Sequence, residues 1–419
     1  MSKIKDIYCR EIFSPQGSPA IETTIVLKDG SAGVSSVAGN EFDSKYSAMN
    51  LLDREQNHVL GRGTLKAVEK IQNIIAPELI GQDALKQHDI DVFLFELDGS
   101  QNKSRFGANA TLGISVAVAR AAAKSAGMPL YLYLREFINH NNLTLDTPKL
   151  IFTLLNGGRT TENMLDFKDY FVIPASYKTF DESLQIGSLL HSKLQSALQH
   201  KHFLPLFTID GGNAVSLQNN DEAFTFLTHV IETSNIQLGH DVFLGIDANA
   251  SNFYHNEKYH IKDTSMPLAS EDLISYYSDF IEKHHVIYIE DPLTEDDWDG
   301  WEKISRTINS DTIIAGDLLT ATNPARLQLA LNKKAISGIV IKPIQIGTII
   351  EALVVTEIAR LSGLKIIVSR WNINTMDDFL ADFAVAISAD YVNFGPFTRA
   401  EYMLNYNRLL AIDKQIKQT

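Results

Sequence analysis

Charged residues end several short apolar runs of this sequence, at positions where a strand would leave a buried core. The runs DVFLGID, HVIYIED and TIIAGD carry Asp247, Glu290 and Asp317 at or next to their last position. Three carboxylates held close together repel one another unless a cation lies between them, and a set of oxygen ligands suits a hard ion such as Mg²⁺. We therefore expect these three side chains to form a magnesium site.

Lys342 ends a fourth run, GIVIK, and a proline follows it directly. An unpaired ammonium group is costly in a buried strand, so its presence there needs a physical reason. Burial and a neighbouring metal ion both favour the neutral amine of a lysine, which can accept a proton. We expect Lys342 to act as a general base. The structural alternative is a permanent ion pair with Glu290 or Asp317.

The same runs indicate the fold that must position these side chains. Short apolar runs recur along the second half of the chain, most of them followed by a helix-like segment, with a spacing typical of a (β/α)8 barrel. Two further runs, LPLFTID and LKIIVSR, end in Asp210 and Arg370. The carboxyl ends of the strands face the active site in such barrels. Any single carboxylate here has a helix N-cap as its alternative, but together the charged ends favour a common site.

Residues 1–136 differ from this pattern and predict a small α+β domain, with the barrel over residues 137–419. The stretch IETTIVLKDGSAGVSSVAG alternates apolar and polar residues on both sides of an Asp-Gly pair, which indicates a β-hairpin. Apolar positions three and four apart follow over residues 60–136, and an Ala-rich segment ends at Gly127, as expected of helices. The expected fold class is therefore α/β.

The composition limits the partners of the chain. It has 419 residues, a formal net charge of −14 and a single cysteine, Cys9. The negative charge argues against a nucleic-acid partner, and one cysteine cannot form an internal disulfide. Neither an apolar stretch of about 18 residues nor the apolar core of a signal peptide is present, so we expect no membrane segment and a cytoplasmic protein. The expected partner is a small molecule.

Over almost its whole length the sequence resembles the enolase family. The similar stretches are REIFSPQGSPAIE, LDGSQNKSRFGANA, LLNGG, IDANASNFY, IEDPLTEDDWDGW, GDLLTATNP, IKPIQIGT and NYNRLLAI. The resemblance implies an enolase-like fold, in which a small α+β N-terminal domain precedes a (β/α)8 TIM-type barrel with a ββαα start, and it implies a homodimer. It also implies that the family's three magnesium ligands fall on Asp247, Glu290 and Asp317, and its proton-abstracting lysine on Lys342.

Other positions depart from the family's pattern. The family's mobile loop reads AGNEFD here, with Phe42 in place of a serine that helps to bind a second magnesium ion. The His-Arg-Ser triplet that grips the phosphate of 2-phosphoglycerate is replaced by Arg370, Trp371 and Asn372, and a second active-site lysine by Asn393. The anchors for an anionic substrate have therefore changed.

Further departures concern the residues that assist the leaving group. The two glutamates with that role in the family correspond to Asp169 and Asp210, each shorter by one methylene, and a nearby histidine corresponds to Thr160. We expect Asp169 and Asp210 to serve as acid catalysts. Arg159 and Arg370 are the new cations near the site. Each either binds a substrate anion, together with Trp371 and Asn393, or forms a surface ion pair.

Two functions remain open from the sequence. The first is a divergent magnesium-dependent lyase that abstracts the proton α to a carboxylate, with weak or no dehydration of 2-phosphoglycerate. The second is a catalytically inactive relative that keeps the scaffold for binding or for dimerisation. The metal carboxylates and the base are kept while the anchors have changed, which favours altered specificity over decay.

Overall fold

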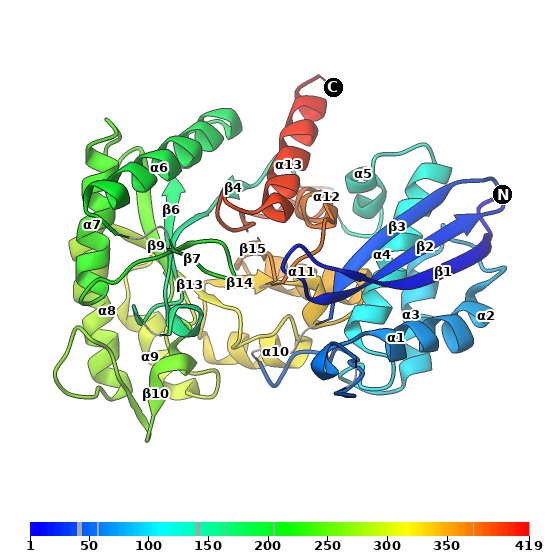
Figure 1. The fold of residues 1–419 in the computed structure, drawn as a ribbon, viewed down its shortest axis with the longest axis horizontal. Helices are drawn as coiled ribbons and strands as arrows, with labels where there is room; N and C mark the ends of the chain where they lie inside the picture. The colour runs from blue at the N-terminus through cyan, green and yellow to red at the C-terminus, as the bar shows by residue number, and fades with distance from the viewer. Residues whose placement is uncertain are drawn as a thin grey trace.

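The computed structural model describes residues 1–39, 44–56, 58–139, 143–162, 164–203, 206–371 and 373–418. A three-stranded antiparallel sheet begins the chain, in the order β1-β2-β3. Its strands are β1 (Ile4–Phe13), β2 (Pro19–Leu27) and β3 (Ala32–Ala38). The predicted hairpin is confirmed, because Gly30, at φ +90°, turns the chain between β2 and β3. Figure 1 shows this sheet, in blue, lying across a helix at one side of the molecule.

Helices complete the N-terminal part of the chain. They are α1 (Leu65–Lys70), a π-helical segment (Ile71–Ile75), α2 (Ala76–Leu79), α3 (Gln87–Asp98), α4 (Ala108–Ser125) and α5 (Leu130–Arg135). The Ala-rich helix α4 is almost entirely buried and packs closely against the sheet. A Cβ at Gly33 of β3 would lie 2.0 Å from the carbonyl oxygen of Ala117, so the close approach requires glycine there. No helix in the described ranges is both long and apolar enough to span a bilayer.

The rest of the chain forms the barrel. Its sheet runs in the order β4-β16-β15-β14-β13-β12-β9-β6-β5, with a hairpin of β8 (Asn213–Ala214) and β7 (Leu206–Phe207) attached to β5. Only Ile151 separates β4 from β5, and these two pair with opposite ends of the series, so the series closes. The strands are β4 (Lys149–Leu150), β5 (Phe152–Asn156), β6 (Asp169–Pro174), β9 (Val242–Asp247), β12 (Val286–Glu290), β13 (Ile313–Gly316), β14 (Gly338–Ile341), β15 (Lys365–Ser369) and β16 (Tyr391–Asn393).

Helices cover the outside of the barrel (Figure 1). They are α6 (Phe180–His200), α7 (Asn220–Glu232), α8 (Ser270–His284), α9 (Trp298–Thr307), α10 (Pro324–Lys333), α11 (Ile349–Leu361), α12 (Phe379–Ala386) and α13 (Ala400–Gln418). Local sequence fixes several of their starts. A capping box of Thr179 and Glu182 begins α6, and the side chain of Asn323 caps α10. The predicted α/β fold with a barrel is confirmed.

Strand β6 runs against both of its neighbours, β5 and β9, whereas the pairs from β9 round to β16 and β4 are parallel. Its first residue, Asp169, therefore pairs with the last residue of β9, Asp247. The residues that begin β6, and not those that end it, lie at the mouth of the barrel.

One predicted strand is wrong. The run LPLFTID was interpreted as a buried parallel strand that ends in Asp210. The part described forms only β7 (Leu206–Phe207), which pairs antiparallel with β8 (Asn213–Ala214). Leu206 and Phe207 are 48 % and 51 % exposed, so their apolar character does not mark a core strand. Asp210 lies instead in the turn between β7 and β8.

Candidate active site at the mouth of the barrel

Asp247, Glu290 and Asp317 lie together at the carboxyl ends of the neighbouring strands β9, β12 and β13. All three are buried, and Glu290 pairs in register with Asp247. Burial, reinforced by the charges of Asp247 and Asp317, raises the pKa of Glu290 well above its usual range. Burial also raises the pKa of Asp247, although Lys168 opposes this shift. The ionised forms of Glu290 and Asp247 are therefore disfavoured at this site.

The oxygens of this cluster suit a divalent cation. Oδ1 of Asp247 is buried and has no hydrogen-bond partner in the described part of the chain. A buried carboxylate oxygen without a partner is costly, and a cation would satisfy it. Carboxylate oxygens are also the ligands that Mg²⁺ prefers. The residues present thus fit a magnesium ion.

Lys342 follows β14 directly and is buried beside these carboxylates. Its ammonium group forms an ion pair with Oδ2 of Asp317, while the amide of Gln345 donates to Oδ1 of the same carboxylate at 3.0 Å. The backbone N–H of Lys342 donates to the hydroxyl of Thr322, which itself donates to Gln345. Lys342 and Asp317 are therefore held in a single hydrogen-bonded network. Gln345 and Thr322 were not singled out from the sequence.

Lys168 is a further functional candidate that the sequence interpretation missed. It precedes β6, is buried, and its Nζ lies 2.9 Å from Oδ2 of Asp247. Burial would lower the pKa of Lys168, but the surrounding carboxylates, Asp247 and Asp169 first, outweigh it and raise this pKa well above its usual value. The signal in the sequence was a lysine just before the apolar run YFVIP, in the stretch FKDYFVIP. A pattern of charged residues after apolar runs does not include it, because Lys168 precedes its strand.

Asp169 and Asp210 flank the cluster. The side chain of Asn156 donates to Oδ1 of Asp169. Burial raises the pKa of Asp169 to about 6, although Lys168 and Arg370 oppose the shift, so this carboxyl can hold a proton near neutral pH. Asp210 is fully buried, and neither of its oxygens has a hydrogen-bond partner among the residues the structure describes. Asp210 thus keeps two acceptor oxygens that no described residue uses.

Arg370, at the end of β15, lies inside the barrel mouth and not at the surface. Its guanidinium stacks on the ring of Tyr402 at 4.6 Å. Burial alone would lower the pKa of Arg370, but Tyr402, Asp210 and Asp169 together raise it. Its Nε has no hydrogen-bond partner in the described chain. The surface ion pair considered from the sequence is therefore wrong for this residue.

The other predicted substrate anchors differ in how deeply they are buried. The indole of Trp371 is buried, with its ring centre 5.5 Å from Nζ of Lys342. Asn393 is buried at the end of β16, where its side-chain oxygen accepts from the N–H of Gly395 at 3.0 Å. Arg159 is exposed on a short 3-10 helix (Gly158–Thr161), so the structure does not bring it into the cluster. Phe42 and Asn372 lie outside the described residues.

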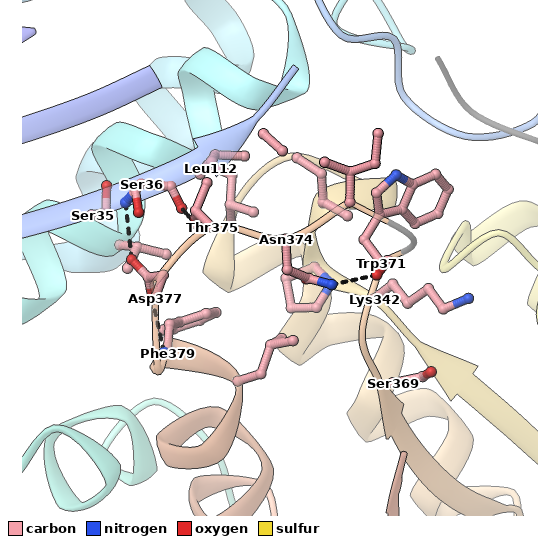
Figure 2. Close-up of a pocket in the computed structure, with 17 residues that line it drawn as sticks. Ser35, Ser36, Leu112, Lys342, Ser369, Trp371, Asn374, Thr375, Asp377 and Phe379 are labelled. Atoms are coloured by element: carbon pink, nitrogen blue, oxygen red, sulfur yellow. Dashed lines mark hydrogen bonds between the residues drawn. The ribbon is translucent and has the colours of Figure 1, made fainter. Parts of the chain in front are cut away.

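Two cavities lie between the domains near this site. A cleft of about 500 Å³ is lined by Arg54, Arg62 and Leu60 of the N-terminal domain and by Thr160, Asp210 and Ile373 of the barrel. A second, small chamber of about 80 Å³ lies between β3 and α4 on one side and residues 369–371 and 373–380 on the other (Figure 2). Lys342, Trp371 and several apolar side chains line the chamber. Both domains thus enclose the approach to the barrel mouth.

A separate group of potential metal ligands lies in the N-terminal domain. Ligand atoms of Glu11, Asp53 and His58 lie within 4.8 Å of one another. The carboxylates already serve the start of α1, because Glu11 accepts from the N–H of Thr64 at 2.5 Å and Asp53 from that of Lys66 at 2.8 Å. His58 pairs with Glu11 at 2.7 Å. This group has a sufficient structural role as a helix cap.

Comparison with known families covers nearly all of the chain. A family model described as "Enolase, N-terminal domain" matches residues 4–134, and one described as "Enolase, C-terminal TIM barrel domain" matches residues 144–419.

Proposed function

We propose that this chain, which belongs to the enolase family, is a divergent magnesium-dependent lyase that acts on a small carboxylic acid. The observation that carries the proposal is the position of Lys342, whose buried ammonium group pairs with Asp317 in the same barrel mouth as Asp247 and Glu290. A base that removes the proton α to a carboxylate must lie close to the group that stabilises the resulting negative charge. Lys342 lies beside the carboxylates of the proposed metal site, as this requires.

Asp247, Glu290 and Asp317 would hold the magnesium ion, which supplies electrostatic stabilisation for the charge that develops on the substrate carboxylate. Lys342, as the neutral amine, takes the α proton. The bond between the β carbon and its hydroxyl then breaks, and a proton from Asp169 or Asp210 lets the hydroxyl leave as water. Asp169 suits this role because burial raises its pKa to about 6.

The substrate differs from 2-phosphoglycerate in this proposal. Trp371 and Asn393 stand at two positions where the family binds an anionic substrate, and neither side chain is cationic. The buried Arg370 is a candidate anchor because its Nε lacks a partner among the described residues. Arg159 is a weaker candidate because it is exposed. We also expect, from family membership, a homodimer, and we keep the cytoplasmic location and the domain division at residues 136 and 137 as expectations.

The test is deuterium exchange. A panel of small carboxylic acids is incubated with the protein and Mg²⁺ in D₂O, and loss of the α proton is followed by NMR. At least one acid should exchange, and Lys342→Met should reduce the rate by about a thousandfold, as expected for removal of a positioned base. Exchange that survives in Lys342→Met would exclude this lysine as the base. If no acid of the panel exchanges, the alternative of a catalytically inactive scaffold takes precedence.

Dehydration of 2-phosphoglycerate provides a second test. Each charge-assisted hydrogen bond to a phosphate contributes about 1.5–3 kcal/mol, so loss of several such anchors should lower kcat/KM by several decades. We expect the formation of phosphoenolpyruvate, followed by its ultraviolet absorbance, to be at or below the limit of detection. A kcat/KM of about 10⁵ M⁻¹s⁻¹, which is ordinary for an enzyme, would contradict the proposed change in substrate.

A further inference from the structure

Two buried lysines flank the three carboxylates of the barrel mouth. The neighbouring strands run in the order β6-β9-β12-β13-β14. Lys168, before β6, pairs with Asp247 of β9, and Lys342, after β14, pairs with Asp317 after β13. Glu290 of β12 lies between the two pairs. Internal ammonium groups thus neutralise much of the charge that a divalent ion would otherwise balance.

Lys168 and Asp247 contact each other through both their side chains and their backbones. The ammonium group lies 2.9 Å from Oδ2 of Asp247, and the backbone N–H of Lys168 donates to the carbonyl oxygen of Asp247, also at 2.9 Å. The side chains of Lys168 and Asp247 are only 10 % and 3 % exposed. Oδ1 of Asp247 nevertheless has no partner within the described ranges. One oxygen is therefore used by the lysine, and the other stays available.

We infer that Lys168 is a built-in counter-cation of the carboxylate cluster, which holds Asp247 through Oδ2, leaves Oδ1 for a divalent ion, and weakens the binding of that ion by charge repulsion. The inference rests on the proposed magnesium site and adds a residue that sets its affinity. Lys168 is thus a positioning residue that acts through Asp247.

Two opposing effects decide whether a substitution of Lys168 raises or lowers the affinity for Mg²⁺. Lys168 orients Asp247, which favours metal binding, and its positive charge repels the metal, which opposes binding. The ammonium group of Lys168 and a Mg²⁺ ion would each contact one oxygen of the same buried carboxylate. Solvent screens the repulsion between these two cations only weakly there. Glutamine keeps a hydrogen-bond donor but removes the charge. Lys168→Gln should therefore increase the affinity for Mg²⁺.

The experiment compares metal-stripped wild type and Lys168→Gln by isothermal titration calorimetry with MgCl₂. We expect the dissociation constant of the variant to be lower by at least about tenfold. Without metal, the variant should unfold at a lower temperature than wild type, because Asp247 loses its counter-charge, and Mg²⁺ should restore the difference. If the variant folds only with metal, chelator titration of the loaded protein gives the free Mg²⁺ concentration at the unfolding midpoint.

Two control variants isolate the charge at this position. Lys168→Arg keeps the charge and should bind Mg²⁺ with an affinity close to that of wild type. Lys178 follows the other end of β6 and pairs at 2.7 Å with Asp241, which precedes β9. Lys178→Gln thus removes a Lys–Asp pair, more exposed at 20 % and 25 %, from the opposite end of the same two strands, and the Mg²⁺ affinity should not change.

The outcomes separate this inference from the proposed site. Equal or weaker binding by Lys168→Gln, with binding by wild type intact, overturns the role of Lys168 and leaves the magnesium site standing. An equal gain in Lys178→Gln also overturns it, because the effect would then follow from net charge alone. If neither wild type nor Lys168→Gln binds Mg²⁺, the magnesium site is wrong and the inference falls with it.

Discussion

Lys342 and Asp317 illustrate how one pair of residues can serve both stability and chemistry. The sequence interpretation treated the general base and the ion-pair partner as alternatives. The structure shows the pair with Asp317, buried and supported by Gln345 and Thr322. This geometry also suits the proposed base, because a metal ion on the carboxylate would compete for Asp317 and release the amine.

The stability of this pair can be measured with Lys342→Met in the absence of divalent ions. The variant leaves Asp317 buried and without its counter-charge, so the free energy of unfolding should fall by about 3–5 kcal/mol in urea denaturation. Adding Asp317→Asn should recover much of the loss, because the unpaired charge is then removed as well. A loss below about 1 kcal/mol for Lys342→Met alone would show that the pair contributes little to the fold.

At the scale of residues, the sequence predicted site residues best where a charged residue directly follows an apolar run that forms a parallel strand. Asp247, Glu290, Asp317 and Lys342 were found in this way, and the structure brings them together. Lys168 was missed because its strand enters the barrel mouth from the opposite direction. The burial of Arg370 depends on Tyr402, which is distant in sequence, so no local pattern could predict it.

At the scale of elements, short apolar runs did not always indicate strands. The runs before Asp247, Glu290 and Asp317 form barrel strands because neighbouring strands and outer helices bury both of their faces. Residues 206–207 are equally apolar but form an exposed hairpin strand. Periodicity did not predict that β6 is antiparallel to its neighbours. The direction of a strand depends on how the chain closes the barrel, which a local pattern does not contain. Only the family resemblance implied a ββαα start.

The segment after β16 packs tightly around the buried side chain of Arg370. Gly395 has φ +94°, and a Cβ there would lie 2.3 Å from Nε of Arg370 and 2.9 Å from the ring of Tyr402. Gly395→Ala should therefore lower the free energy of unfolding by about 3 kcal/mol or more, through backbone strain and steric overlap. Chemical denaturation of the purified variant measures this loss.

Gly363 provides the matched control. It also has a positive φ, +77°, but a Cβ there meets no atom within 4 Å. Gly363→Ala should cost only the backbone strain, about 1 kcal/mol. Equal losses for the two variants would contradict the close packing of Arg370 against Gly395.

At the scale of the whole molecule, a buried carboxylate joins the N-terminal domain to the barrel. Asp91 of α3 accepts hydrogen bonds from Ser115 of α4 at 2.9 Å and from the backbone N–H of Ile350 in α11 at 3.0 Å. Gln87 donates to its other oxygen at 3.0 Å. Burial raises the pKa of Asp91 to about 7, although these hydrogen bonds oppose the shift. The contact between the domains should therefore depend on pH.

Proton linkage sets the direction of this dependence. The ordinary pKa of an aspartate, 3.8, applies to the unfolded chain, so between pH 4 and 7 the folded protein binds the extra proton. Stability contributed by the protonated Asp91 is then present at low pH and lost as the pH rises to about 7, by up to about 4 kcal/mol. Asp91→Asn cannot ionise and should gain stability relative to wild type over this range.

Unfolding in urea at about pH 5 and about pH 7.5 checks this prediction. The difference in unfolding free energy between Asp91→Asn and wild type should shift in favour of the variant at the higher pH. Asp89→Asn, on the exposed side of the same helix, should show no such shift. A constant difference for Asp91→Asn would mean that this carboxyl ionises normally in the folded protein.

The reversed direction of β6 has a practical consequence for altering the selectivity of this protein. Libraries for barrel proteins usually randomise positions just after each strand and leave the opposite rim unchanged to protect the scaffold. In this chain, that scheme would vary Ala175 and its neighbours on the supporting rim and omit Lys168 and Asp169. A useful library must instead allow for the antiparallel direction of β6. It should diversify the residues before this strand and preserve the residues after it.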